Sequence, residues 1–154
     1  MKKPYQALIF DWDGTLADST SMIVNAVQQA FVENDFAMPS DSEASHIIGL
    51  ALPKAMQYLA PQANADEIFA LSESYKRLFL NPNNQMRLFQ DAQALLPSLK
   101  PDYWLTVATG KSRRGLDRAL TEVGLDNGFF LATRTVDECA SKPSPDMILS
   151  LCDE

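Results

Sequence analysis

The spacing of apolar residues changes twice along the chain and indicates three kinds of segment. A short apolar run at residues 7–10 predicts a buried strand. From residue 16 to residue 85, apolar positions recur three and four residues apart, which is typical of amphipathic helices. From residue 90 onward, helical spacing alternates with two further apolar runs that have the length and composition of strands. The pattern therefore predicts an α/β protein in which an all-helical segment is inserted between strands of one sheet.

Capping residues, glycines and prolines set the expected boundaries of these elements. Helices are predicted at residues 19–34, 41–48, 50–59, 66–80, 90–99 and 112–123, with a closing helix that begins at about Pro145, and further strands are predicted at 104–108 and 129–133. The second helix is expected to be capped by Asp41 or Ser42. A strand, a helix and a strand at this spacing form a parallel pair with a right-handed crossover, so a parallel sheet is expected.

Composition narrows the choice of partners. The chain has 154 residues, of which 46% are hydrophobic, and this is enough for one domain with a modest insertion. It carries 13 basic and 20 acidic side chains, a net charge of −7. Nucleic acid and anionic membranes are therefore not expected as partners. No run approaches the roughly 20 apolar residues of a membrane span, and Asp11 cuts the first apolar run too early for a signal peptide.

The two cysteines bear on the compartment. Cys139 and Cys152 have neither a metal-ligand spacing nor a CxxC spacing. We interpret them as free thiols in a reducing cytoplasm, and a disulfide between them is the less favoured alternative.

Candidate chemistry begins where the first strand ends. Asp11 and Asp13 directly follow the apolar run and precede Gly14, which has wide backbone freedom. In open α/β sheets, ligands bind beyond the carboxyl ends of the strands, so both carboxylates are expected at the rim of a pocket. Two carboxylates this close repel each other unless a cation or a shared proton compensates. The alternative is a loop in which the aspartates merely favour the turn.

The segment Asp11-x-Asp13-Gly14-Thr15-Leu16-x-Asp18-Ser19 resembles the first motif of the haloacid dehalogenase-like (HAD) phosphohydrolases. This resemblance implies that Asp11 is a nucleophile that forms an aspartyl-phosphate. It also implies that Asp13 protonates the leaving alkoxide and later deprotonates the hydrolytic water. A second carboxylate at position 13 fits phosphoryl chemistry and disfavours the dehalogenase and phosphonatase branches.

Two later segments resemble further motifs of that family. Thr109 and Gly110 end the predicted strand 104–108, where the family holds the phosphoryl oxygens with a hydroxyl and backbone N–H groups. Lys142 stands before a Pro-x-Pro turn, as the family's charge-neutralising lysine does. The implied site therefore has Asp11 and Asp13 as catalytic residues and Thr109, Gly110 and Lys142 as phosphate-binding residues. The implied cofactor is Mg²⁺, held by the Asp11 carboxylate and the Asp13 backbone carbonyl.

The resemblance also implies an architecture. Residues 1–15 and 86–154 would form a Rossmann-like core, and residues 16–85 an α-helical cap that closes over the pocket. The turn at 48–50 resembles the cap segment that contacts substrate, although Gly49 could simply end a helix. The main departure from the family is that the acidic fourth motif, which supplies further magnesium ligands, has no counterpart here. A minor one is that Phe89-Gln90-Asp91 stands where relatives often carry a Pro-Gly turn. The resemblance thus spans the chain but covers a core that is incomplete at its C-terminal side.

These observations predict a magnesium-dependent phosphatase that hydrolyses a small phosphorylated metabolite, most similar to the phosphoglycolate phosphatase-like group. A cytoplasmic monomer or homodimer is expected. Two alternatives stay open: a sugar phosphomutase of the same superfamily, and a catalytically impaired fragment that kept the fold. Arg113 and Arg114 near the second motif could extend the positive side of the pocket, but a solvated helix face is the preferred interpretation. Lys54, Lys76 and Arg77 in the helical segment could likewise reach the substrate, although charged helix faces usually point to water.

Overall fold

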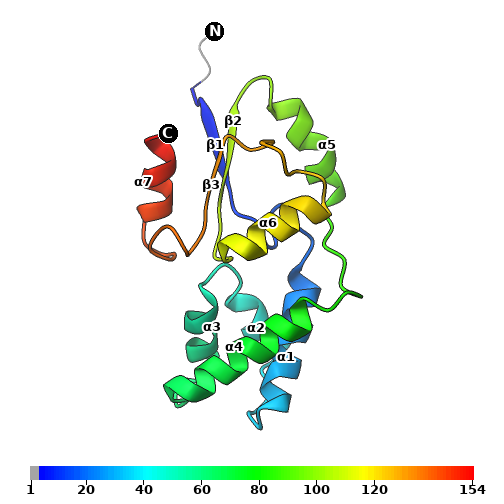
Figure 1. The fold of residues 1–154 in the computed structure, drawn as a ribbon, viewed down its shortest axis with the longest axis vertical. Coiled ribbons are helices and arrows are strands. Elements are labelled where there is room, and N and C mark those ends of the chain that lie inside the picture. Colours follow the sequence, from blue (N-terminus) through cyan, green and yellow to red (C-terminus); the bar gives the residue numbers. More distant parts are fainter. Residues whose placement is uncertain (1–3) are drawn as a thin grey trace.

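The computed structural model describes residues 4–154, and within them it contains three strands and seven helices (Figure 1). The strands are β1 (Ala7–Phe10), β2 (Trp104–Ala108) and β3 (Ala132–Arg134). The helices are α1 (Thr20–Glu33), α2 (Asp41–His46), α3 (Leu52–Leu59), α4 (Ala65–Phe79), α5 (Gln90–Leu99), α6 (Arg113–Glu122) and α7 (Asp146–Cys152). None of the described helices is long and apolar enough to cross a membrane.

The three strands form one parallel sheet, as predicted, and their order in it is β1-β2-β3. Leu8 pairs with Leu105, and Val107 pairs with Thr133. Because successive side chains of a strand point to opposite faces, the sheet buries residues on both sides. Helices α5 and α6 cover one face, and α7 covers the other. We call the sheet with α5, α6 and α7 the sheet half.

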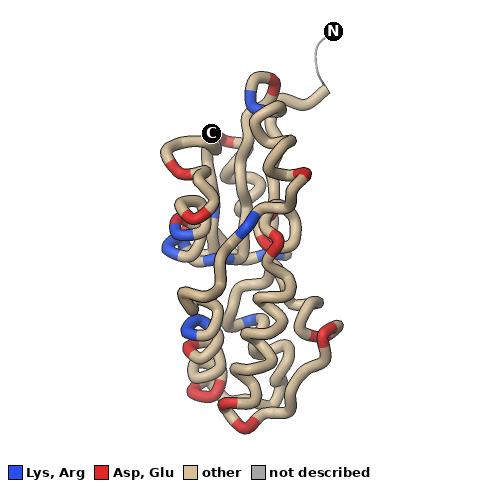
Figure 2. Tube along the Cα trace, turned by 90° about the vertical axis from the view of Figure 1, so that its right-hand side faces the viewer, with Lys and Arg blue, Asp and Glu red and all other residues tan. Residues whose placement is uncertain are grey.

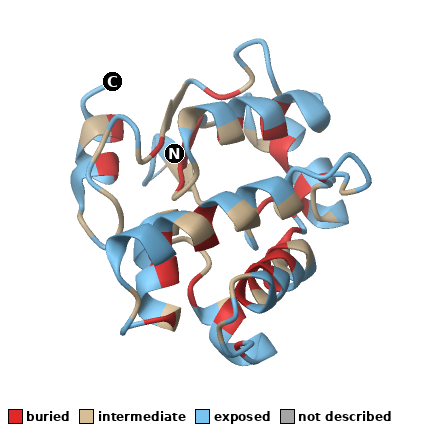
Figure 3. Ribbon diagram, turned by 60° about the horizontal axis from the view of Figure 1, so that its bottom comes forward, coloured by how far each residue is buried: buried red, intermediate tan, exposed pale blue. Residues whose placement is uncertain are grey.

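The helices α1 to α4 form a second packed body, which we call the helical half. Its apolar cluster centres on Val27, Phe31, Met56 and Leu71, all of them buried. Buried positions lie on the inner faces of the helices and exposed positions on the outer faces (Figure 3). Phe79, at the end of α4, packs against this cluster and against the cluster of the sheet half.

The chain passes from the sheet half to the helical half after β1 and returns to the sheet half before α5. Leu16 and Ala17, which fall in the predicted helical insertion, pack in the apolar cluster of the sheet half. Ala17 also forms isolated bridges with Asp13 and with Leu88 from the returning segment. The division at residues 15/16 and 85/86 stays a prediction.

Two predicted boundaries are wrong. The cap of α2 is Ser40 and not Asp41 or Ser42, because Ser40 and Glu43 form a reciprocal capping box. The third strand covers residues 132–134 and not 129–133. The apolar residues Phe129 and Phe130 lie outside the strand, because they follow a turn at Gly128 and pack edge-to-face against each other in the core. Their apolarity therefore reflects burial and not strand geometry.

Candidate active site

A tight turn follows β1, and in it the side chain of Trp12 points away from those of its neighbours Asp11 and Asp13. The Trp12 carbonyl accepts hydrogen bonds from the N–H groups of Thr15, Leu16 and Ala17, and Gly14 adopts φ +74°. The Trp12 side chain is fully buried in the core of the sheet half, as expected from strand alternation. Both carboxylates are therefore left at the carboxyl end of the sheet.

Asp11 is paired with a lysine that lies 131 residues away in the sequence. Its Oδ1 atom accepts a hydrogen bond from Lys142 Nζ at 2.9 Å and another from the Trp12 N–H at 2.8 Å. The two side chains are 31% and 29% exposed, so solvent reaches the pair only in part. The loop before α7 thus brings Lys142 to Asp11.

Asp13 is held by two different residues. Its Oδ1 accepts a hydrogen bond from the Ser19 hydroxyl at 2.9 Å, and its Oδ2 lies 3.2 Å from Lys111 Nζ. The Asp13 and Lys111 side chains are only 12% and 11% exposed. Ser19 precedes α1, but its hydroxyl is used for Asp13 and makes no cap hydrogen bond to the helix.

The predicted phosphate-binding residues lie at the end of the neighbouring strand. Thr109 is buried, its N–H donates to the Arg134 carbonyl, and its Oγ1 accepts a hydrogen bond from the Lys111 N–H. Because β1 and β2 are parallel neighbours, Thr109 and Gly110 end at the same edge of the sheet as Asp11. The structure brings all five predicted site residues to this edge.

The helical half is seated on the sheet half at Gly110. A Cβ atom at this position would lie 2.5 Å from the Gly49 carbonyl oxygen and 2.8 Å from that of Leu50. The same turn faces Asp11, because a Cβ at Gly49 would lie 3.7 Å from Asp11 Oδ2. Lys54 of α3 adds a second contact by donating to Ser141 Oγ at 2.6 Å, next to Lys142. The structure is therefore closed over the site.

Gly110→Ala is expected to prevent this seating, since a Cβ cannot approach two backbone carbonyls so closely. We expect kcat/KM for a phosphate ester to fall about a hundredfold, the effect of misplacing groups by about 1 Å. Small-angle X-ray scattering should report a larger radius of gyration.

Gly128→Ala is the control, because Gly128 has φ +76° and open space around it. That variant should lose about 1 kcal/mol of stability without losing activity. Unchanged kinetics and dimensions in Gly110→Ala would contradict the seating role.

A cavity of about 810 Å³ lies between the two halves and reaches Asp13, Gly110 and Lys111. Two aromatic residues of α4 line it: Tyr75 and Phe79 stack with ring centroids 5.5 Å apart, and Lys111 Nζ lies 4.8 Å from the Phe79 centroid. Burial raises the pKa of Tyr75, and the Asp13 carboxylate nearby raises it further, so the phenol stays protonated at neutral pH.

Sequence reasoning missed these aromatic contacts and the Lys111–Asp13 ion pair. The available signal was the spacing of Tyr75 and Phe79, which places both on one face of a helix.

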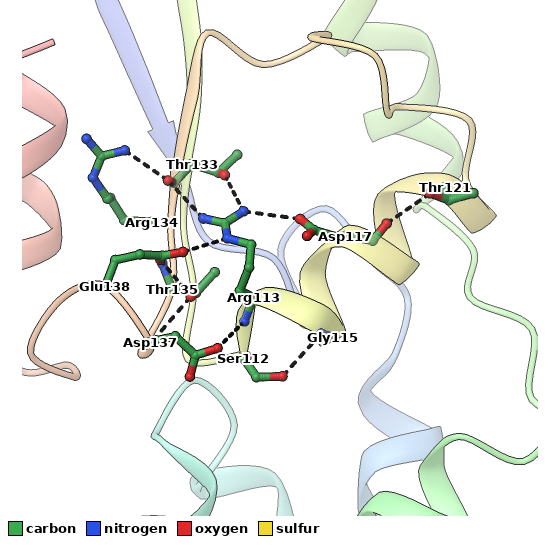
Figure 4. Close-up of polar contacts among 10 residues, drawn as sticks. All are labelled: Ser112, Arg113, Gly115, Asp117, Thr121, Thr133, Arg134, Thr135, Asp137 and Glu138. Atoms are coloured by element: carbon green, nitrogen blue, oxygen red, sulfur yellow. Dashed lines mark hydrogen bonds and ion pairs between the residues drawn. The ribbon is translucent and has the colours of Figure 1, made fainter.

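Arg113 was predicted to be solvated, but it ties α6 to β3 (Figure 4). Its guanidinium donates to Glu138 at 2.6 Å, to Asp117 at 3.2 Å and to the Thr133 hydroxyl at 2.8 Å. Glu138 also accepts hydrogen bonds from the N–H and hydroxyl groups of Thr135. Burial raises the pKa of Glu138, but the hydrogen bonds from Arg113 and Thr135 outweigh it and lower the pKa to about 2.

Glu138→Gln should test this network through the pH dependence of stability. The folded-state pKa of Glu138 lies below its ordinary 4.5, so the carboxylate stabilises the fold above pH 4.5 and loses its effect as pH falls toward 2. Glu138 is 36% exposed, so we expect screening to limit the contribution to about 1 kcal/mol. Urea unfolding at pH 7 and at pH 3 should show the gap between wild type and variant shrinking in acid. A gap that does not change with pH would contradict this role.

Comparison with known proteins agrees with this geometry. A family model of haloacid dehalogenase-like hydrolases matches residues 8–154. The chain belongs to the haloacid dehalogenase-like hydrolase family. The predicted α/β fold with inserted helices is confirmed by the structural comparison. The crystal structure of a predicted phosphoglycolate phosphatase from Haemophilus somnus matches with a TM-score of 0.83 at 22% identity, over 99% of this chain and 72% of that one.

Two relatives with different named activities are similar to the chain in sequence. Tyrosine-protein kinase PtkA of Mycobacterium tuberculosis is 30% identical over 126 residues, which are 80% of this chain and 42% of that protein. Pyrophosphatase PpaX of Listeria monocytogenes is 30% identical over 154 residues, covering 94% of this chain and 67% of that protein. The chain thus spans less than half the length of PtkA and about two thirds that of PpaX.

The oxygen atoms available in this haloacid dehalogenase-like site are of the kind that bind a hard cation. Asp11 Oδ2 and the Asp13 backbone carbonyl accept no hydrogen bond from another residue within 4–154. Mg²⁺ is commonly held by one or two such oxygens together with waters and substrate phosphate. The described residues contain no group of three or more His, Cys, Asp or Glu that could hold a metal. The residues present therefore fit Mg²⁺ with few protein ligands.

Proposed function

We propose that this chain is a magnesium-dependent phosphatase that hydrolyses small phosphomonoesters through an aspartyl-phosphate on Asp11. The observation that carries the proposal is the placement of Asp11, whose carboxylate is paired with Lys142 at 2.9 Å and ends β1 beside Thr109 and Gly110. The match to the haloacid dehalogenase-like hydrolases and the similarity to pyrophosphatase PpaX support the same reaction class.

In the first step, a carboxylate oxygen of Asp11 bonds to phosphorus while the ester P–O bond breaks. The carboxyl group of Asp13 gives its proton to the departing alkoxide. Lys142, the Thr109 hydroxyl and the backbone N–H groups after it stabilise the charge on the phosphoryl oxygens.

In the second step, water bonds to the phosphorus of the aspartyl-phosphate and gives a proton to the Asp13 carboxylate. The bond to Asp11 breaks, which releases inorganic phosphate and restores both aspartates. Ser19 and Lys111 hold the Asp13 carboxylate from two sides and so orient it for both transfers.

Magnesium, held by the Asp11 carboxylate and the Asp13 carbonyl, would offset the negative charges that meet when a phosphate approaches Asp11. The turn at 48–50 and the aromatic pair of α4 cover the site and exclude bulk water during transfer.

Hydrolysis of p-nitrophenyl phosphate by the purified chain tests this function. We expect release of nitrophenolate that EDTA abolishes and Mg²⁺ restores. No release at any magnesium concentration from a chain shown to be folded by circular dichroism would contradict the proposal.

A further inference from the structure

The walls of the cavity carry five basic side chains, and one of them differs from the rest. Four have a carboxylate partner, in the pairs Lys76–Glu73, Arg77–Glu33, Lys111–Asp13 and Arg118–Glu122. Arg114 also lines the cavity, but within residues 4–154 its side chain makes no hydrogen bond or ion pair. Among the basic residues of the cavity wall that the structure describes, Arg114 is therefore the one whose side chain is available to bind an anionic ligand.

Arg114 lies in the first turn of α6, the helix that follows the phosphate-binding segment. Ser112 caps this helix by accepting a hydrogen bond from the Gly115 N–H at 3.1 Å. The preceding residue, Arg113, is directed to β3, where its guanidinium donates to the hydroxyl and the carbonyl of Thr133 (Figure 4). Most basic positions gather at mid-height of the molecule, where the two halves meet and where acidic positions lie among them, whereas the far tip of the helical half carries acidic positions (Figure 2). Five basic and four acidic side chains within residues 4–154 line the cavity, so its lining has a small positive excess that corresponds to the one basic side chain without a carboxylate partner there, Arg114.

The size of the cavity indicates that such an anionic group would be part of a ligand larger than a phosphate ion. The cavity of about 810 Å³ lies in the range that holds drug-sized ligands, about 300–1,000 Å³. Asp11 does not itself line the cavity, so a phosphoryl group at Asp11 would lie beside the cavity's edge at Gly110 and Lys111. The leaving group, which must pass Asp13, would then lie between the apolar residues of the helical half and the start of α6.

We propose that Arg114 binds a second anionic group of the substrate, so that the substrates are phosphomonoesters whose leaving group carries a carboxylate or another phosphate. The inference rests on the proposed function, because it takes the first anionic group to be the phosphoryl group at Asp11. A charge-assisted hydrogen bond to a guanidinium supplies the selectivity. Esters without a second anion would leave Arg114 unpaired and bind more weakly.

Inert phosphonates test this subsite without relying on turnover. Calorimetry in the presence of Mg²⁺ would compare benzylphosphonate with 4-carboxybenzylphosphonate and p-xylylenediphosphonate, which add a carboxylate and a second phosphonate at the same place. We expect at least one of the two added groups to raise affinity about tenfold, the effect of one charge-assisted hydrogen bond. The group that gives the larger gain identifies the kind of anion.

The gain should disappear in Arg114→Gln and persist in Arg118→Gln. Arg118 is the matched control because it lines the same wall but is paired with Glu122 at 2.7 Å. Equal affinity of the wild type for all three phosphonates, or a gain that survives in Arg114→Gln, would overturn the subsite alone. Failure of every phosphonate to bind a folded chain would instead contradict the proposed function and the subsite with it.

Discussion

Asp11→Asn is expected to lower the rate of phosphate-ester hydrolysis by at least about a thousandfold, as removal of a nucleophile does in other enzymes. The amide has the same shape as the carboxylate but cannot form the phosphoryl-enzyme bond. Asp11 also carries the ion pair with Lys142, so the variant leaves this lysine without its partner. Steady-state hydrolysis of p-nitrophenyl phosphate would measure the loss, and thermal unfolding would show that the fold is kept.

Asp18→Asn is the matched control for this variant. Asp18 belongs to the same motif and loses the same charge, but it is exposed, and within residues 4–154 its side chain makes no hydrogen bond or ion pair. Its backbone N–H donates to the Arg87 carbonyl. We expect its activity to stay within a few-fold of wild type. Equal activity of wild type and Asp11→Asn would show that Asp11 is not the nucleophile.

Asp13→Asn is expected to have the second largest effect, a loss of about 10²–10⁴-fold, the usual range for a general acid or base. The loss should depend on the leaving group. Nitrophenolate leaves without help from a proton, whereas an alkoxide needs one, so hydrolysis of an alkyl phosphate should suffer more than hydrolysis of p-nitrophenyl phosphate. The ratio of the two kcat/KM values, measured in wild type and variant, reports this role.

An equal loss for both esters would contradict proton transfer to the leaving group. It would point instead to a positioning role of Asp13, which is held by Ser19 and Lys111. Lys111→Met separates these cases, because it removes the ion pair while keeping the Asp13 carboxyl group. If Asp13 is the acid, Lys111→Met should lower both rates by a similar factor.

Two of the three strands and most helices could be predicted because their signals are local. The run at residues 7–10 and the caps and breaks around α1, α4 and α6 are set by neighbouring residues, and the structure shows these elements within one or two residues of the prediction. The strand at 129–133 failed for the opposite reason. Phe129 and Phe130 are apolar because of a tertiary contact, which short-range patterns do not reveal.

The candidate site divides in the same way. The aspartates after β1 and the hydroxyl after β2 follow from strand ends and motifs, while the pairing of Lys142 with Asp11 across 131 residues could be expected only from the family resemblance. The Lys111–Asp13 pair and the Tyr75–Phe79 stack over the site depend on how the helical half is seated on the sheet half. The same holds for the position of Arg114 in the cavity wall, where it has no partner among residues 4–154. No sequence spacing encodes that seating, because it arises from the contact of Gly110 with the turn at 48–50.

The most direct test of the central claim is to find the phosphoryl group on Asp11. The chain would be mixed with a phosphomonoester and Mg²⁺, quenched in acid within milliseconds to seconds, and digested for peptide mass spectrometry. We expect the mass of one phosphoryl group on the peptide that contains Asp11, a higher yield in Asp13→Asn because water attack is slowed, and none in Asp11→Asn. Turnover without a phosphoryl group on that peptide in either wild type or Asp13→Asn, or a phosphoryl group on another residue, would contradict the account.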